Sequence, residues 1–286
     1  KRAISPGERL NFSLRYKNNI QISLRNVSVQ AFLEGTALEL GSLSVEEGGV
    51  FSGANTAILW GPGSSSKLRE IQAGEQGELR FSVSTYDRPP VRGVQDKNLI
   101  VRVRAFIDTL TVPDELVGTK ISSEDTLEIK VRSKVLISGR SVYRLSPILN
   151  SGPLPPRVGQ ETTYTISWEI RNFTNDLRNV EVSTSLPPNV KWANAVFPSD
   201  ASLRFDLASG EVRWTPGEIK AGVGVLSPAL TASFKLSVIP SEVDVGKSVT
   251  LVGPTVFRGR DTFVEEDVEI SSDTLTSELK EDSGAT

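Results

Sequence analysis

The amino-acid sequence predicts an all-β protein made of two tandem β-sandwich domains. Three observations support this prediction. The chain resembles itself at a period of about 150 residues, each copy contains short segments in which apolar and polar residues alternate, and Gly- and Pro-rich turns separate those segments. A length of 286 residues also suits about two domains.

The internal repeat keeps its order along the chain. Leu24-Arg25-Asn26-Val27 returns identically as Leu177-Arg178-Asn179-Val180. Other matches follow in the same order: Gly7 with Gly159, Trp60 with Trp214, Ala73-Gly74 with Ala221-Gly222, Phe81 with Phe234, and Ile121-Ser122-Ser123 with Ile270-Ser271-Ser272. Because the offset drifts by only a few residues, we interpret the halves as copies of one fold and place the domains at residues 1–133 and 134–286.

Alternation of apolar and polar residues predicts the strands of each copy. Residues 10–17 place Leu10, Phe12, Leu14 and Tyr16 on one face, and the second copy does the same with Tyr164, Ile166, Trp168 and Ile170. A period of two marks a strand with one buried face. Further strands are expected near residues 27–33, 79–83, 101–105 and 180–186.

These strands predict one hydrophobic core per domain. The expected core residues are Phe12, Leu14, Val27, Val29 and Phe81 in the first copy, and Tyr164, Ile166, Val180, Val182 and Phe234 in the second. Many short strands with Gly/Pro turns are typical of an immunoglobulin-like sandwich, which needs about 100 residues. We expect the surplus to form loops, mainly at 34–66 and 86–98.

Composition excludes several kinds of chemistry. The chain has no Cys, His or Met. A thiolate nucleophile, a disulfide and a Ser-His-Asp triad are therefore impossible, while a Ser-Lys site stays open. A net charge of −3 gives no basic footprint for nucleic acid. We expect no enzyme activity and no cofactor. Without an initiator Met, we expect a fragment or processed product, with any membrane anchor in an upstream segment.

The second copy resembles a known family. The matching pieces are Val158-Gly159-Gln160, Tyr164-Thr165-Ile166, Asn179-Val180, Leu186-Pro187-Pro188-Asn189-Val190, Trp214, Ala221-Gly222 and Phe234-Lys235-Leu236. In this order they resemble the DUF11 or conserved-repeat type of immunoglobulin-like domain, found in prokaryotic surface proteins. The resemblance implies an extracellular or cell-surface location and a spacer or adhesive role. It implies no catalytic residues.

Two functions stay open at this level. The first is a structural spacer module of a cell-surface or envelope protein, which includes the role of a subunit in an extracellular assembly. The second is an adhesin or carbohydrate-binding module that uses exposed loops. Trp192 has no counterpart in the first copy, so Trp192, Val196 and Phe197 are the candidate residues for contact with a ligand or a cell-surface glycan.

Two other groups of residues favour structure over binding. The repeat-matched Trp60 and Trp214 are expected to pack in the cores rather than to stack on sugars. The acidic run formed by Asp261, Glu265, Glu266, Asp267 and Glu269 lacks the Asp-x-Asp-x-Asp-Gly pattern of a calcium loop. We therefore predict no metal site.

The two copies differ at their first strand. Val135-Leu136-Ile137 and Val142-Tyr143 predict an edge strand ahead of the second copy, whereas the first copy begins close to Pro6-Gly7. We expect the first strand of domain one to be missing or nearly so. Its open edge would accept an added strand, supplied either by upstream residues or by a neighbouring chain in an assembly.

Overall fold

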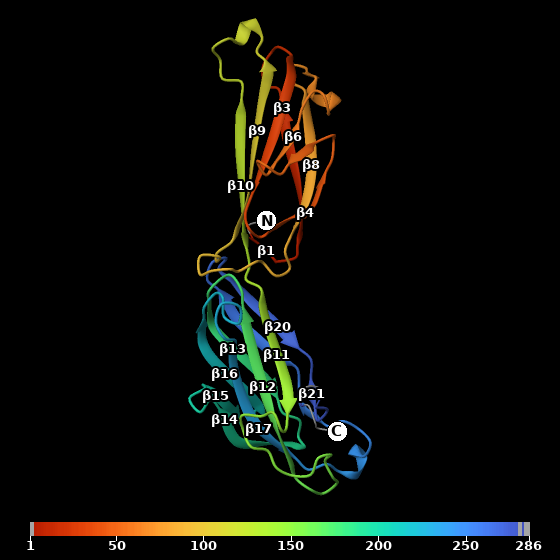
Figure 1. The fold of residues 1–286 in the computed structure, drawn as a ribbon, viewed down its shortest axis with the longest axis vertical. Helices are drawn as coiled ribbons and strands as arrows, with labels where there is room; N and C mark the ends of the chain where they lie inside the picture. The colour runs from red at the N-terminus through yellow and green to blue at the C-terminus, as the bar shows by residue number, and fades with distance from the viewer. Residues whose placement is uncertain (1–2, 280–281, 283–286) are drawn as a thin grey trace. The chain divides into compact units, whose positions relative to one another are not determined.

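The protein folds almost entirely as β-strands joined by turns, as Figure 1 shows. The structure is a computed structural model that describes residues 3–279 and residue 282. The chain separates into unit 1 (Lys1–Pro90 and Asn98–Lys134) and unit 2 (Val91–Lys97 and Val135–Thr286). Helical structure in the described residues is limited to three 3-10 turns: η1 (Ser66–Leu68), η2 (Asp114–Leu116) and η3 (Glu242–Asp244). The predicted all-β class is confirmed.

Unit 1 contains two sheets. The larger has the order β1-β10-β9-β3-β6-β5, with β7 paired to β3, and the smaller has the order β2-β8-β4. The strands of the larger sheet are β1 (Ala3–Ile4), β3 (Leu24–Glu34), β5 (Val50–Ser52), β6 (Ala57–Trp60), β7 (Glu70–Ile71), β9 (Ile100–Thr111) and β10 (Ser123–Val131). Those of the smaller sheet are β2 (Arg9–Lys17), β4 (Leu38–Val45) and β8 (Gln76–Thr85).

Unit 2 repeats this plan with β11 and the pair β18-β21 in addition, and its described residues hold no counterpart of β1. One sheet has the order β11-β12-β17-β14 and the other β15-β16-β13-β19-β20, beside the small pair β18-β21. The strands are β11 (Val135–Val142), β12 (Thr162–Asn172), β13 (Leu177–Ser185), β14 (Val190–Phe197), β15 (Leu203–Asp206), β16 (Glu211–Ile219), β17 (Leu230–Val238), β18 (Thr250–Val252), β19 (Thr255–Asp261), β20 (Glu266–Ser272) and β21 (Leu275–Thr276).

Each unit has its own hydrophobic core between its two sheets. Nine of the ten predicted core residues are buried, and Leu14 is only partly buried against the core of unit 1. Phe81 stacks on Phe12 with ring centroids 4.8 Å apart, and Phe234 meets Trp168 edge-on at 4.9 Å. The predicted cores are therefore correct, with Leu14 as the one exception.

Cross-strand pairs show that the repeated residues occupy matched places. Val29 lies opposite Trp60 in unit 1, and Val182 lies opposite Trp214 in unit 2. Both tryptophans are buried. In the second sheet of each unit, Phe12 lies opposite Phe81 and Ile166 opposite Phe234. Strand β2 therefore corresponds to β12, β8 to β17, β3 to β13 and β6 to β16.

The repeated Asn of Leu-Arg-Asn-Val has a conformational reason. Asn26 and Asn179 both have positive φ, 54° and 53°. Asn tolerates the left-handed region better than most residues. In β13 this residue lies at an irregularity in the pairing with β16 and β19, which is how a β-bulge redirects a strand. The four-residue identity thus marks a shared bend at the start of β3 and β13.

A side-chain amide closes one end of each sandwich. In unit 1, Asn18 donates through Nδ2 to the carbonyl oxygens of Ile22, Ile71 and Gln72 at 2.8, 3.0 and 3.2 Å. In unit 2, Asn172 donates to those of Asn175, Ile219 and Lys220 at 2.7, 3.3 and 3.1 Å. Both asparagines are buried. We call this arrangement the Asn clasp.

The repeated Ala-Gly dipeptide belongs to the same clasp. Gly74 and Gly222 have φ of 79° and 85°, which a glycine adopts without strain. Their N–H groups donate to the backbone carbonyls of Asn18 and Asn172, each at 2.9 Å. The turn and the amide together tie the end of β2 to the turn between β7 and β8, and the end of β12 to the connection between β16 and β17.

One sequence prediction about unit 1 is wrong. Residues 34–66, expected to be mainly loop, contain β4, β5 and β6. Strands β5 and β6 are short, and β4 has an irregularity between Glu39 and Ser44, so none of the three shows a long regular alternation. Residues 86–98, also expected to be loop, contain no strand.

Candidate functional site

The two units differ most at the outer edge of β2. In unit 2, β11 pairs antiparallel with β12 from Val135 opposite Asn172 to Val142 opposite Thr165. In unit 1, no strand of the described chain pairs with the corresponding edge of β2. The segment before β2 instead forms β1, which pairs in parallel with β10 through Ala3 and Ile4. The first strand that the sequence predicted to be missing or nearly so is thus represented by the two-residue β1, which lies on the other sheet.

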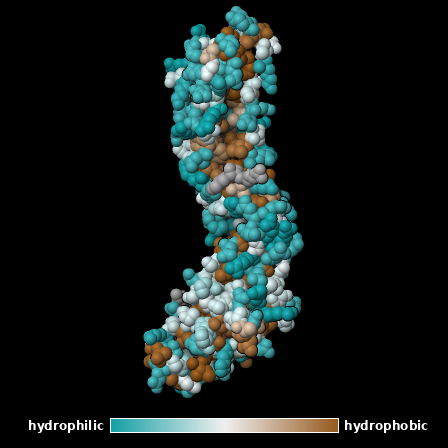
Figure 2. All heavy atoms as spheres, turned by 180° about the vertical axis from the view of Figure 1, so that it is seen from behind, coloured by the Kyte–Doolittle hydropathy of each residue, from teal (hydrophilic) through white to brown (hydrophobic). Residues whose placement is uncertain are grey.

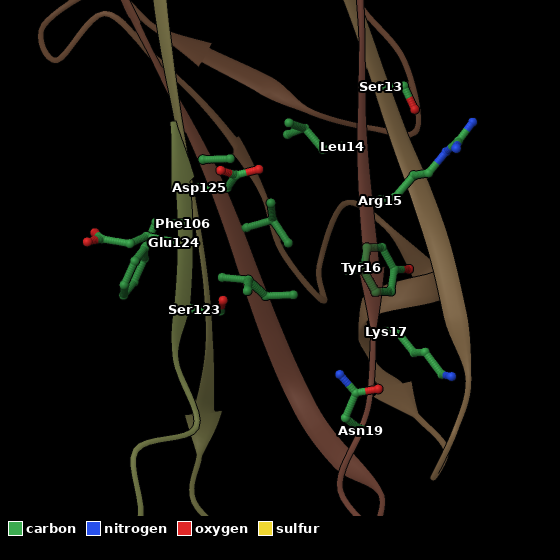
Figure 3. Close-up of a pocket in the computed structure, with 13 residues that line it drawn as sticks. Ser13, Leu14, Arg15, Tyr16, Lys17, Asn19, Phe106, Ser123, Glu124 and Asp125 are labelled. Carbon is green, nitrogen blue, oxygen red and sulfur yellow. The ribbon is translucent and has the colours of Figure 1, made fainter. Parts of the chain in front are cut away.

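A groove of about 320 Å³ lies where β11 would lie in unit 2. It is bounded by β2 on one side and by β9 and β10 on the other. Figure 3 shows Leu14 pointing from β2 into the groove, and Ser123 and Asp125 facing it from β10, whereas Glu124 and Phe106 point away. We call this groove, together with the free edge of β2, the seam.

Apolar side chains in the seam lack cover that their counterparts in unit 2 have. Leu14, Tyr16 and Ile107 are only partly buried. The matched side chains of unit 2 are fully buried: Trp168, Ile170 and Phe257. Figure 2 shows apolar side chains open to view on unit 1 between hydrophilic ones. The seam is therefore a partly uncovered region of the core.

Backbone hydrogen-bonding groups line the same edge. The N–H of Asn18 donates to the carbonyl of Glu75 at 2.8 Å, and its carbonyl accepts from Gly74. Asn18 thus directs both backbone groups toward the β8 side. Because direction alternates along an antiparallel strand, Lys17, Arg15 and Ser13 direct theirs toward the open edge. These are the groups that pair with an added strand.

The seam has a basic and an acidic side. Arg15, which is largely exposed, pairs with Glu78 at 3.3 Å on the outer face of β2. Hydrogen bonds from Ser13, Arg80 and Arg15 lower the pKa of Glu78 to about 2. Burial, followed by the negative charges of Glu75 and Glu47, raises the pKa of Tyr16 above 10.0, so it stays a neutral phenol. Across the groove, Asp125 supplies a carboxylate.

The three residues predicted to contact a ligand lie on or at the end of β14. Trp192 is partly buried and stacks on Phe205 at 5.6 Å and on Phe234 at 5.5 Å. Val196 packs against the core of unit 2, while Phe197 is 49% exposed. The structure therefore places one of the three side chains, Phe197, at the surface.

The acidic run near the end of unit 2 lies in the β19-β20 hairpin, where its side chains form ion pairs and hydrogen bonds. Arg258 pairs with Glu269 at 2.9 Å, and Arg260 pairs with Asp267 at 3.0 Å. Asp261 is buried and accepts from the N–H of Phe263 and from the side chain of Asn175. No group of acidic residues in the described part of the chain is arranged to hold a metal ion.

The sequence predicts an open edge but does not show which residues line it. Leu14 and Tyr16 are predicted as inward residues of an ordinary strand, and Ser13, Arg15 and Lys17 as its outward face. A signal was available: Trp168 and Ile170 hold the matched positions beside a predicted edge strand, whereas Leu14 and Tyr16 have no such strand before them. None of the described residues forms a helix long and apolar enough to cross a membrane.

Comparison with known proteins gives only distant structural matches. No protein-family model and no curated protein matches the chain. Among solved structures, the C-terminal domain of the Streptococcus pyogenes antigen I/II-family protein AspA aligns with 96% of this chain and 94% of its own, at 10% identity and a TM-score of 0.36.

Two pilins are also similar. The major pilin subunit BcpA of Bacillus cereus matches at 8% identity and a TM-score of 0.34, over 87% of this chain and 69% of its own. The major pilin SpaD of Corynebacterium diphtheriae matches at 12% identity and 0.30, over 88% and 59%. At these values the likeness concerns β-strand architecture and does not bear on function.

Proposed function

We propose that the chain is a non-catalytic structural module, in which two sandwich units serve as spacers in a prokaryotic cell-surface or envelope protein. The main support is what the repeat preserves. Asn18 and Asn172, Gly74 and Gly222, and Trp60 and Trp214 each recur at matched positions. All of them close turns or fill cores. Duplication of fold-closing residues is what a structural repeat requires.

The connection between the units also suits a spacer. Strand β10 ends at Val131 and β11 begins at Val135, so three residues join the last strand of unit 1 to the first of unit 2. A short connection between two paired strands transmits tension with little slack. The DUF11-like pattern in unit 2 supports placing the module outside the cell.

Single-molecule pulling on the whole chain tests this function. A spacer with two self-contained cores should unfold in two separate steps, each releasing about 40 nm of chain, because extended residues span 3.3–3.6 Å each. Variants Phe81→Ala and Phe234→Ala should each weaken one step. A single step that releases the whole chain at once would show a shared core and contradict the proposal.

The alternative, an adhesin or glycan-binding module, depends mainly on Phe197. Carbohydrate-stacking sites need an open aromatic face, and the ring of Trp192 is engaged by Phe205 and Phe234. The exposed ring of Phe197 is the feature that favours this alternative. Loss of cell-surface adhesion in a Phe197→Ala variant that melts like the parent would support it.

A further inference from the structure

The seam of unit 1 has the features of a binding site for a β-strand. We propose that it binds an extended segment of a partner polypeptide, antiparallel to β2, with aliphatic side chains facing the core and acidic side chains facing Arg15 and Lys17. The proposal rests on the structural role proposed above and specifies how such a module would join an assembly. Adding a strand to a free edge combines backbone hydrogen bonds with side-chain pockets.

Unit 2 shows the geometry of the occupied seam. There β11 lies along β12 with Leu136 opposite Arg171, Ile137 opposite Ile170 and Ser138 opposite Glu169. Val135 is buried and Ile137 packs against the core. The matching residues of β2 are Tyr16 for Ile170, Arg15 for Glu169 and Lys17 for Arg171. An aliphatic residue in the place of Ile137 would thus cover Tyr16.

The segment leading into β2 is engaged elsewhere. Ala3 and Ile4 pair with Lys130 and Val131 of β10, and the N–H of Arg132 donates to the carbonyl of Ile4 at 2.9 Å. In unit 2 the corresponding segment is β11, paired with β12 itself. The two units therefore use their leading segments on different sheets. This difference is why we assign the strand on β2 to a partner.

Charge selects among partners. The outward side chains of β2 include Arg9, Arg15 and Lys17, and one acidic side chain beside them, Glu78, is already paired. Two copies of β2 paired antiparallel about Ser13 would set Arg9 against Lys17, and like charges directly opposite are destabilising. A strand with acidic residues opposite Arg15 and Lys17 gains two favourable pairs. A second copy of β2 is therefore a poorer occupant.

Synthetic peptides built on β11 are suitable probes. Their parent is residues 134–143, and the changes are made at the positions opposite Lys17 and Arg15. One peptide carries Leu136→Glu and Ser138→Glu, a matched one carries Leu136→Lys and Ser138→Lys, and a third carries Ser138→Pro, which removes the N–H that would donate to β2 opposite Arg15. Each is added to the full chain, and amide hydrogen exchange is followed at Ser13 and Arg15, with Ser167 and Glu169 as internal references.

We expect the Glu peptide to slow exchange at Ser13 and Arg15 and to bind about tenfold more tightly than the Lys peptide, since two cross-strand charge pairs change sign. The Pro peptide should protect neither amide. In a Lys17→Glu chain, which keeps the Arg15–Glu78 pair, the preference should weaken, and in an Arg15→Glu/Lys17→Glu chain it should reverse.

Three results would overturn the proposal. The first is that neither charged peptide protects the edge, and the second is that both protect it equally. The third is that the edge amides are already protected before any peptide is added. Protection that rises with protein concentration would identify a second copy, and protection independent of concentration would identify the protein's own chain. Single-molecule pulling measures the unfolding of the two cores and does not depend on the seam. These failures would therefore not contradict the proposed spacer function.

Discussion

Asn18 of unit 1 and Asn172 of unit 2 make the same set of contacts. Asn172 is the last residue of β12 and Asn18 directly follows β2. Each donates its side-chain amide to the carbonyls of matched dipeptides, Ile71-Gln72 and Ile219-Lys220. Each also accepts from the N–H of a positive-φ glycine. The clasp recurs in both units because buried carbonyl groups need a hydrogen-bond donor, whatever residues lie on the surface.

Removal of the clasp should destabilise the unit that contains it. Asn18→Ala leaves three carbonyl groups without their side-chain donor, and we expect a loss of about 2–4 kcal/mol in unit 1, with a similar loss in unit 2 for Asn172→Ala. Denaturant unfolding measures both. Asn11→Ala, on the exposed face of β2, the strand that precedes Asn18, is the control and should change stability by less than about 0.5 kcal/mol. Equal losses in the control and the clasp variants would refute the assignment.

The central aromatic residues should act only within their own unit. Phe81→Ala and Phe234→Ala each remove a fully buried ring that packs on other rings, and each should cost about 3–5 kcal/mol. Two-transition thermal unfolding separates the effects. A loss below about 1 kcal/mol, or equal damage to both transitions, would show that the cores are not those described.

An open seam predicts an asymmetry between two leucines that face each other. Leu14 and Leu79 are direct partners across β2 and β8, yet Leu79 is buried and Leu14 only partly so. Leu79→Ala should cost about 2–5 kcal/mol and Leu14→Ala about 1 kcal/mol, because a side chain half in water loses less on truncation. Chemical denaturation measures the free energy of unfolding of the two variants. Equal losses in Leu79→Ala and Leu14→Ala would mean that the seam is closed.

Acid should release a second clasp in unit 2. Asp282 accepts the N–H groups of Tyr143, Arg144 and Leu145, each at 2.7 Å. Burial works against its ionisation, but these three bonds prevail and hold its pKa below the ordinary 3.8. A carboxyl whose pKa is lower in the folded than in the unfolded protein contributes stability at pH values above its ordinary pKa. It loses that contribution as the pH falls through its pKa in the folded protein.

The comparison of Asp282→Asn with the parent should therefore depend on pH. At pH 7 the variant should lower the stability of unit 2 by about 2 kcal/mol, and the difference should fade as the pH drops below 3.8. Asp273→Asn, an exposed change in the same segment, is the control. A difference that persists unchanged at low pH would rule out the charge as its source.

The strands and cores could be predicted from sequence because the patterns behind them are local or repeated. Alternation in β2 and β12 is visible over a few residues, and Trp60 with Trp214 is visible through the repeat. The Asn clasp could also have been found, since Lys17-Asn18 and Arg171-Asn172 share one offset. A lone Asn after a strand, however, resembles a turn residue until its long-range partners are known.

Other features depend on partners distant in the chain. Strand β4 is irregular and β5 and β6 are short, so only the pairing of β4 with β8, of β6 with β3 and of β5 with β6 distinguishes them from loop. Trp192 stood out in the sequence as an unmatched aromatic residue, but Phe205 and Phe234 reach it from separate strands. No local pattern reports such contacts.

Residue-resolved hydrogen exchange of the whole chain, without added peptide, tests the account most directly. The two units share the arrangement of their two main sheets, and unit 2 has β11 on the edge that stays open in unit 1. Amides of Asn18 and Asn172 should both be protected, and those of Ser167 and Glu169 should be protected by β11. The matched amides of Ser13 and Arg15 should exchange at rates near those of an exposed strand edge. Equal, strong protection at Ser13, Arg15, Ser167 and Glu169 would contradict the open seam, and loss of protection at either asparagine would contradict the shared fold.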